Sequence, residues 1–167
     1  TCYSYVPGAI HLTENLGFCS GDEIWDIDAN EDNNAAALGV MGGQAWLIGR
    51  GEQNSNNPLC NAWDGSNGSK SFYRAMRDCN IFLENVDKPR DLTSYEKSRW
   101  IAEVKFLKAY YHYQLLRMYG PIAILDVNIE VSASADEVKV YREPVDVVVA
   151  YIKGLINEAL PGLPETI

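Results

Sequence analysis

Residues 93–121 predict one long helix whose two ends are set by its own sequence. Thr93 and Glu96 have the spacing of a capping box, in which each side chain accepts a hydrogen bond from the other residue's backbone N–H. At the far end, Gly120 supplies the left-handed residue that caps a helix after Tyr119, and Pro121 prevents the helix from continuing. A helix of this length constrains every other element of the fold.

Apolar residues lie along two sides of this predicted helix. One stripe comprises Trp100, Val104, Leu107, Tyr111, Leu115 and Met118, and the second comprises Phe106, Tyr110 and Tyr113. A helix at a protein surface needs only one apolar stripe, so two stripes indicate two packing partners. The aromatic residues are therefore expected to hold a scaffold together rather than to form a stacking platform for a ligand.

Two further helical patterns flank the long helix. The apolar positions are Phe72, Ala75, Met76, Cys79, Phe82, Leu83 and Val86 in residues 69–86, and Val147, Val148, Tyr151, Ile152, Leu155 and Ala159 after Pro144. Their spacings of three and four are helical, and proline suits a first helical turn. The predicted fold class is all-α, with irregular tetratricopeptide-like helical hairpins and long Gly/Asn/Asp-rich loops, because the connectors differ too much in length for a strict repeat.

The composition of the chain changes near residue 69. Residues 1–68 are rich in Gly, Asn and Asp, which favour turns and irregular loops, whereas residues 69–167 carry the helical patterns. We therefore divide the chain into a loop-rich segment with ligand-facing loops (1–68) and a helical scaffold (69–167) within one structural domain. The chain opens without methionine and stops just after a helix, so this domain is expected to be incomplete at both ends.

The charge of the chain argues against several classes of partner. Fourteen basic and 23 acidic residues give a formal net charge of −9. Without a Lys/Arg cluster, the chain is a poor candidate for binding nucleic acid or anionic lipid surfaces. No run reaches the roughly 20 apolar residues of a membrane-spanning helix, and no signal peptide is visible.

The sequence shows no constellation that supports catalysis. His112 lies among tyrosines with no serine or cysteine partner at a suggestive spacing, which favours a structural histidine. Glu103 is expected to be a structural carboxylate that pairs with Lys105 or Lys108, because no second carboxylate completes a glycosidase pair. We therefore predict that the chain is not an enzyme.

The cysteines do not form a metal-binding or redox motif. Cys2, Cys19, Cys60 and Cys79 have spacings that match no CxxC pattern. Buried thiols are the favoured interpretation, and one or two disulfides are the alternative in an oxidising compartment.

Residues 26–32 (DIDANED) begin like a calcium-binding EF-hand loop. The EF-hand pattern needs glycine at its sixth position and glutamate at its twelfth, and Glu31 and Ala37 occupy these positions. A solvated acidic loop is the default interpretation, and a calcium site of another kind is the alternative. No other metal or cofactor is predicted.

Tryptophans in the loop-rich segment are the best candidates for ligand binding. A sugar site needs a flat aromatic face for the C–H side of the ring, with fixed amides, carboxylates and guanidinium groups for the hydroxyls. The predicted ligand-binding residues are Trp46, Trp25, Asp22, Glu23, Arg50 and Asn54. Trp63 immediately precedes a helix, so it is more simply explained as a plug of a small core under the loop.

Three segments resemble signatures of the SusD/RagB family of outer-membrane nutrient-binding lipoproteins. Residues 71–86 (SFYRAMRDCNIFLENV) are similar to its Y-x-x-I-x-x-x-N-x-x-L helix, and residues 103–125 (EVKFLKAYYHYQLLRMYGPIAIL) to E-x-x-F-L-R-A-Y-Y-Y-F-x-L-x-x-x-Y-G-x-V-P-L. Residues 141–164 (YREPVDVVVAYIKGLINEALPGLP) are similar to R-x-S/T-V-x-E-V-Y-x-x-I-x-x-D-L-x-x-A-x-x-x-L-P. Lys108, Glu143 and Gly154 depart from the usual arginine, Ser/Thr and aspartate, and residues 1–62 match only loosely.

The resemblance implies a SusD-like fold, here as a fragment, and a function. It implies a glycan-binding lipoprotein on the outer surface of the outer membrane that captures oligosaccharides for a SusC-like TonB-dependent transporter. The lipid anchor is expected to lie outside this fragment, so Cys2 is not assigned to it. Two alternatives stay open: a peptide-binding member of the same family, and a generic helical-repeat scaffold for protein partners.

Overall fold

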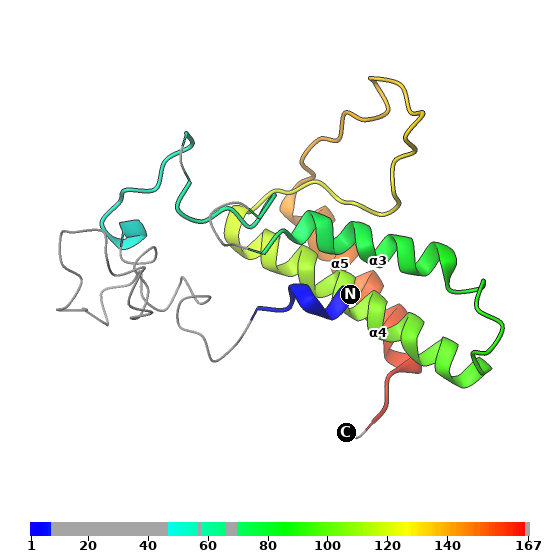
Figure 1. The fold of residues 1–167 in the computed structure, drawn as a ribbon. Coiled ribbons are helices and arrows are strands. Elements are labelled where there is room, and N and C mark those ends of the chain that lie inside the picture. The colour runs from blue at the N-terminus through cyan, green and yellow to red at the C-terminus, as the bar shows by residue number, and fades with distance from the viewer. Residues whose placement is uncertain (8–46, 57, 66–69, 166–167) are drawn as a thin grey trace. The chain divides into compact units, whose positions relative to one another are not determined.

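The computed structural model describes residues 1–7, 47–56, 58–65 and 70–165 (Figure 1). The chain forms two compact units. Thr1–Tyr5 with Phe72–Ile167 make up the first, called the helical unit below, and Val6–Ser71 make up the second, called the loop-rich unit after the predicted segment. The predicted division after residue 68 stays a prediction, although the first five residues belong with the helical unit.

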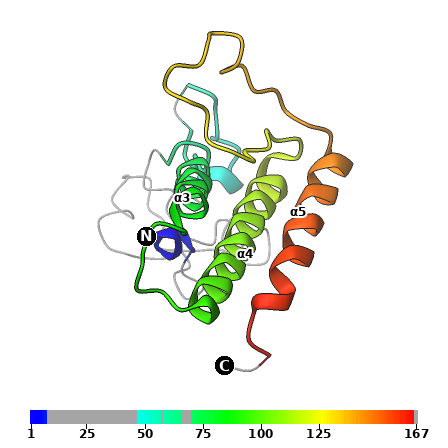
Figure 2. The same cartoon turned by 90° about the vertical axis from the view of Figure 1, so that its right-hand side faces the viewer.

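Three helices form the body of the helical unit: α3 (Phe72–Asn85), α4 (Ser94–Tyr119) and α5 (Val145–Ala159). Two short 3-10 helices, η1 (Cys2–Tyr5) and η3 (Leu160–Gly162), pack against them. The long helix α4 lies between α3 and α5 and runs antiparallel to both (Figure 1 and Figure 2). The described residues contain no strand, only an isolated bridge between Ile122 and Glu143, which confirms the all-α class.

Local sequence sets both ends of α4. The Thr93 side chain accepts a hydrogen bond from the backbone N–H of Glu96, and the Glu96 carboxylate accepts one from the N–H of Thr93, so the predicted capping box is confirmed. Gly120 ends the helix with φ 69°, and its N–H donates to the Leu116 carbonyl at 2.9 Å. Its ψ of −120° lies outside the left-handed helical region, so the predicted left-handed cap is right only in the sign of φ.

The first predicted stripe of α4 forms the main core. Val104, Leu107, Tyr111 and Leu115 are buried, whereas Trp100 and Met118 are each 39% exposed. The ring of Tyr111 stacks on Phe72 of α3 with 5.7 Å between centroids. The predicted α3 face is also buried at Ala75, Met76, Cys79 and Val86.

The second buried side of α4 differs from the predicted one. Phe106 and Tyr113 are 45% and 46% exposed, so they do not form the second interface among the described residues. Ala102, Ala109 and His112 are buried instead, and His112 makes an edge contact with Tyr151 of α5. Small alanine side chains let α5 approach α4 closely, which the count of large apolar residues did not reveal.

The chain that follows α4 is held by side chains rather than by a sheet. On the α3 side, the Tyr73 hydroxyl donates to the Ala123 carbonyl at 3.0 Å and accepts from the Ala123 N–H at 3.1 Å. Asn80, also on α3, donates from Nδ2 to the Leu125 carbonyl at 3.4 Å. Buried backbone groups need partners, and these two side chains supply the bonds that a neighbouring strand would otherwise make.

Helix α4 completes this side-chain clamp, which comprises Tyr73, Asn80, Lys108 and His112. The Leu125 N–H donates to Nε2 of His112 at 3.3 Å, and the Lys108 ammonium donates to the Asp126 carbonyl at 2.5 Å. The clamp therefore fixes residues 123–126 across α3 and α4, and the chain continues from there to α5.

Tyr73→Phe tests the clamp. The substitution leaves the Ala123 N–H and carbonyl without the hydroxyl, so we expect the free energy of unfolding to fall by about 1–3 kcal/mol in urea denaturation. Tyr113→Phe is the matched control at an exposed position and should stay within about 0.5 kcal/mol of the parent protein. Equal effects of the two substitutions would contradict the clamp's role.

Substitution of two glycines, Gly154 within α5 and Gly162 in η3, is expected to change stability in opposite directions. A Cβ on Gly162 would lie 2.7 Å from Cβ of Ala102 and 3.1 Å from the Ser98 carbonyl oxygen, whereas a Cβ on Gly154 meets nothing within 4 Å. Gly162→Ala should therefore destabilise the unit by about 1–3 kcal/mol through overpacking. Gly154→Ala should stabilise it by about 0.5–1 kcal/mol, because alanine favours a helix interior. Thermal unfolding of both variants checks the difference in sign.

Candidate functional site

Only part of the predicted ligand site lies among the described residues. Trp46, Trp25, Asp22 and Glu23 lie outside them, as do residues 26–32 with the calcium-like pattern. The structure places Arg50 and Asn54, which belong to the loop-rich unit.

Arg50 and Asn54 meet on one exposed turn around Glu52. The Arg50 guanidinium Nε lies 3.1 Å from Oε1 of Glu52, and Asn54 donates from Nδ2 to the Glu52 carbonyl at 3.3 Å. Gly51 makes the turn at φ 80°, and the N–H groups of residues 51 and 52 close it by donating to Ile48 and Leu47. Both side chains contact Glu52, and their assignment to a ligand site stays a prediction.

The turn presents chemistry suited to hydroxyl groups. A guanidinium has five N–H donors, so Arg50 retains donor capacity beyond its contact with Glu52. The carboxylate of Glu52 has two acceptor oxygens, and it was not among the predicted ligand residues although it lies between two of them in sequence. Both charged side chains are about half exposed, so their ion pair contributes little to stability and leaves them accessible to a ligand.

Trp63 is half-buried in the same unit. The backbone N–H of Trp63 donates to Oδ1 of Asn61 at 3.1 Å, and its backbone carbonyl accepts from the Ser71 hydroxyl at 3.3 Å. These bonds anchor the backbone around Trp63 just before α3.

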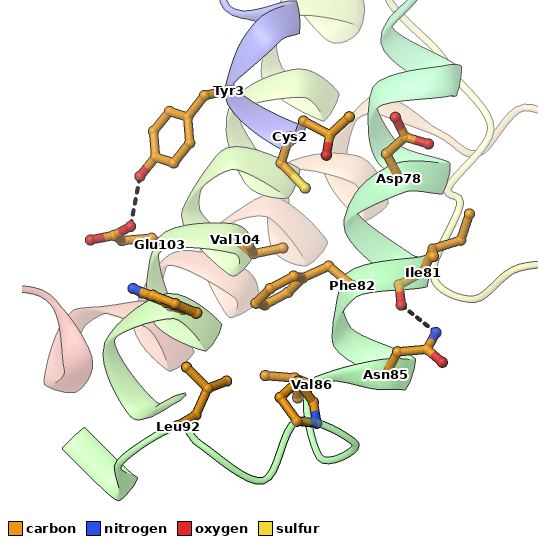
Figure 3. A pocket seen from close by; sticks show the side chains of 13 residues that line it. Cys2, Tyr3, Asp78, Ile81, Phe82, Asn85, Val86, Leu92, Glu103 and Val104 are labelled. Atoms are coloured by element: carbon orange, nitrogen blue, oxygen red, sulfur yellow. Dashed lines mark hydrogen bonds between the residues drawn. The ribbon is translucent and has the colours of Figure 1, made fainter. Parts of the chain in front are cut away.

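A concave feature lies in the helical unit between α3 and α4. Its volume is about 630 Å³. Its apolar lining comprises Ile81, Phe82, Val86, Pro89, Leu92, Trp100 and Val104 (Figure 3). This apolar groove was not predicted from the sequence, because the spacing of Trp100 fits the packed stripe of the helix. Trp100 instead lines the groove and is partly exposed.

The carboxylate of Glu103 lies at the rim of the groove and is already paired. The Tyr3 hydroxyl donates to Oε2 of Glu103 at 2.9 Å (Figure 3). Nε of Arg99 donates to Oε1 of Glu103 at 2.8 Å. Burial and the bond to Glu103 raise the pKa of Tyr3 to about 12. The predicted pairing of Glu103 with Lys105 or Lys108 is therefore wrong.

The two lysines have other partners. Lys105 pairs with Glu158 of α5 at 2.7 Å, and Lys108 pairs with Asp126 at 3.4 Å. These pairings link α4 to α5 and to the segment that follows α4. Glu103 pairs instead with Tyr3 of the N-terminal turn and with Arg99. Glu103 is thus a structural carboxylate, as expected, with partners that the sequence did not indicate.

His112 is a structural residue and not an acid–base group. It is fully buried, its Nδ1 lies 2.8 Å from the Lys108 carbonyl, and its Nε2 accepts from Leu125. A carbonyl partner requires a proton on Nδ1 and an N–H partner requires a lone pair on Nε2, so the imidazole is neutral. Burial lowers the pKa of His112 to about 4, which keeps it neutral at physiological pH.

The described residues contain neither a metal-ligand cluster nor a membrane-spanning helix. In that part of the chain, no group of three His, Cys, Asp or Glu side chains is placed to hold a metal ion. None of the helices described there combines the length and apolar character needed to cross a membrane.

Comparison with known proteins identifies the family. A family model described as "Starch-binding associating with outer membrane" matches residues 28–167. The chain belongs to the SusD-like family. The match extends well beyond the three motifs, into the loop-rich unit that resembled the family only loosely.

A solved relative has the same fold. The SusD-like protein of Bacteroides fragilis NCTC 9343 superimposes with a TM-score of 0.69 over 99% of this chain at 19% sequence identity. The chain covers 28% of that protein's length. No curated protein sequence matches the chain. Members of the SusD-like family are outer-membrane-associated binding proteins, which confirms the predicted localisation at the outer membrane and the prediction that the chain is not an enzyme.

The buried histidine predicts a specific dependence of stability on pH. The folded-state pKa of about 4 lies below the ordinary 6.5, so the unfolded chain binds this proton more readily. The stabilisation is complete above pH 6.5 and is lost as the pH falls towards 4. Between pH 7 and 4, the parent protein should lose roughly 3 kcal/mol more unfolding free energy than His112→Gln, as measured by urea denaturation. Parallel pH profiles would contradict this account.

Proposed function

We propose that the protein is a cell-surface glycan-binding lipoprotein that captures oligosaccharides and delivers them to a SusC-like TonB-dependent transporter. The observation that carries the proposal is the match of residues 28–167 to a family described as starch-binding and associated with the outer membrane. Starch-derived oligosaccharides are therefore the first ligands to test. Attachment by an N-terminal lipid and delivery to the transporter are parts of the same proposal.

The turn around Glu52 supports glycan binding by its chemistry. Arg50 supplies donors to sugar hydroxyls, and Asn54 belongs to the same exposed turn. Trp46 and Trp25 would supply the aromatic faces, and Asp22 and Glu23 would supply acceptors. Exposed charged contacts are individually weak, and weak contacts suit a protein that must release its ligand to a transporter.

The apolar groove supports a second candidate, a scaffold for a protein partner. Two antiparallel helices bordering an apolar groove are suited to an amphipathic helix of another protein. The volume of about 630 Å³ and the partly exposed Trp100 fit this use. Co-purification from membranes separates the two candidates, because the first predicts recovery of a TonB-dependent transporter and the second predicts soluble partners.

Tryptophan substitutions in the full-length protein test the glycan site. Trp46→Ala and Trp25→Ala should each weaken binding of maltooligosaccharides at least about tenfold in isothermal titration calorimetry, because stacking on the sugar ring is lost. Arg50→Ala should weaken binding less, since its guanidinium is solvent-exposed.

Trp100→Ala is the matched control, because Trp100 lies in the helical unit and should leave glycan affinity unchanged. Unchanged affinity in both loop variants would contradict the assignment of the site. Binding of peptides but not glycans by the parent protein would favour the peptide-binding alternative.

A further inference from the structure

One side of the pair formed by α4 and α5 is held by polar contacts. Lys105 of α4 pairs with Glu158 of α5 at 2.7 Å, and His112 of α4 makes an edge contact with Tyr151 of α5. His112 also accepts the hydrogen bond from Leu125 as part of the side-chain clamp. These contacts and the clamp therefore lie on the same side of the pair, called the clamp side below.

The opposite side of the pair carries exposed apolar side chains. An α-helix turns by about 100° per residue, so Phe106 and Tyr113 of α4 lie across the buried alanines of that helix from the clamp side. By the same geometry, Val149 and Ile156 of α5 lie across its buried row from the clamp side. These four residues, which are 36% to 48% exposed, are called the α4–α5 face below.

The spacing of the α4–α5 face suits a third helix. Phe106 and Tyr113 are seven residues apart, and so are Val149 and Ile156. Seven residues make about two helical turns, so each pair forms a ridge along its own helix. Apolar ridges on two neighbouring helices are the surface against which the apolar stripe of another helix packs.

Among the described elements, none supplies that third helix. Helix α5 packs there only on α4 and η3. The sequence of α4 indicated a second packing partner on the side of Phe106 and Tyr113, and α5 instead packs beside the buried alanines of α4. A helix on the α4–α5 face would be the partner that this second stripe indicates.

The chain after α5 is directed back onto α4 at the start of this face. Figure 2 shows that α5 ends beside the N-terminal end of α4, and η3 packs on α4 there. A Cβ on Gly162 of η3 would lie 2.7 Å from Cβ of Ala102, which is one helical turn before Phe106. Leu163 is extended, with φ −85° and ψ 145°, so the chain no longer follows the direction of α5.

We propose that an amphipathic helix of the same protein, following residue 167, packs on the α4–α5 face. The solved relative supports a further segment, because this chain covers only 28% of that protein's length. A helix that starts near Ala102 and crosses Phe106 and then Tyr113 runs antiparallel to α5. It forms a second helical hairpin with α5, stacked beside the hairpin of α3 and α4, as in helical repeat proteins.

Hydroxyl-radical footprinting of the full-length protein, purified as a monomer without a transporter, tests whether the face is covered. Uncovered, the 46% exposed Tyr113 should oxidise at about half the rate measured in urea-unfolded protein. Under a packed helix, its rate should fall at least about tenfold below the unfolded rate. Tyr111 of the same helix is the matched control, because it is fully buried and gives the rate of a covered ring. Oxidation of Tyr113 at about half the unfolded rate would contradict the proposal.

Photo-crosslinking of the same monomer identifies the occupant. With p-benzoylphenylalanine in place of Tyr113, we expect a cross-link to a peptide that follows residue 167. Cross-links confined to residues 1–167 would overturn the proposal. Protection that appears only when the protein dimerises, or only after a transporter is added, would also overturn it and would assign the face to a second copy or to that partner. The inference rests on the fold and not on the ligand, so its failure leaves the proposed function unaffected.

Discussion

The fold of the helical unit depends on how the backbone after α4 is satisfied. Residues 123–126 run through a part-buried region without a neighbouring strand, and unpaired buried backbone groups would cost about 1–3 kcal/mol each. The side-chain clamp of Tyr73, Asn80, Lys108 and His112 supplies the missing partners. Because clamp residues come from both α3 and α4, the segment can be satisfied only when the helical hairpin is packed.

The clamp also determines how α5 joins the hairpin. The buried ammonium of Lys108 contacts the carbonyl and the carboxylate of Asp126, and the Tyr151 hydroxyl of α5 donates to Oδ1 of the same carboxylate at 2.7 Å. Burial lowers the pKa of Lys108, while the bond from Tyr151 lowers that of Asp126. A buried ammonium is costly unless paired, so Lys108 favours the one arrangement in which α4, α5 and the connecting segment meet.

Local signals in the sequence were sufficient to predict the helices but not their contacts. The capping box at Thr93 is a property of four neighbouring residues, so it could be recognised without knowledge of the fold. The second buried side of α4 could not, because Ala102 and Ala109 carry little periodic signal and His112 is polar. His112 accepts a hydrogen bond from Leu125, and Glu103 accepts one from Tyr3. Helical periodicity contains no information about such distant partners.

The candidate site shows the same limit. Arg50 and Asn54 could be grouped from sequence because a glycine turn brings close neighbours together. The apolar groove could not be predicted, since it exists only where α3, α4 and the N-terminal turn fail to fill the space beside Trp100. The family could be recognised from the motifs, because three motifs in a fixed order are specific to it. The side-chain contacts of the individual residues could not be predicted in this way.

The hydroxyl groups explain why the core uses tyrosine where phenylalanine would supply the same apolar area. Tyr73 binds the backbone of Ala123, Tyr111 binds the Cys2 carbonyl and Tyr151 binds Asp126. Burial raises the pKa of all three, so each stays a neutral donor across the physiological range. Each hydroxyl joins a helix to a segment distant in sequence, which gives these rings a structural task. Aromatic enrichment in the helices is therefore a poor guide to the ligand, and stacking on a sugar stays a prediction for Trp46 and Trp25.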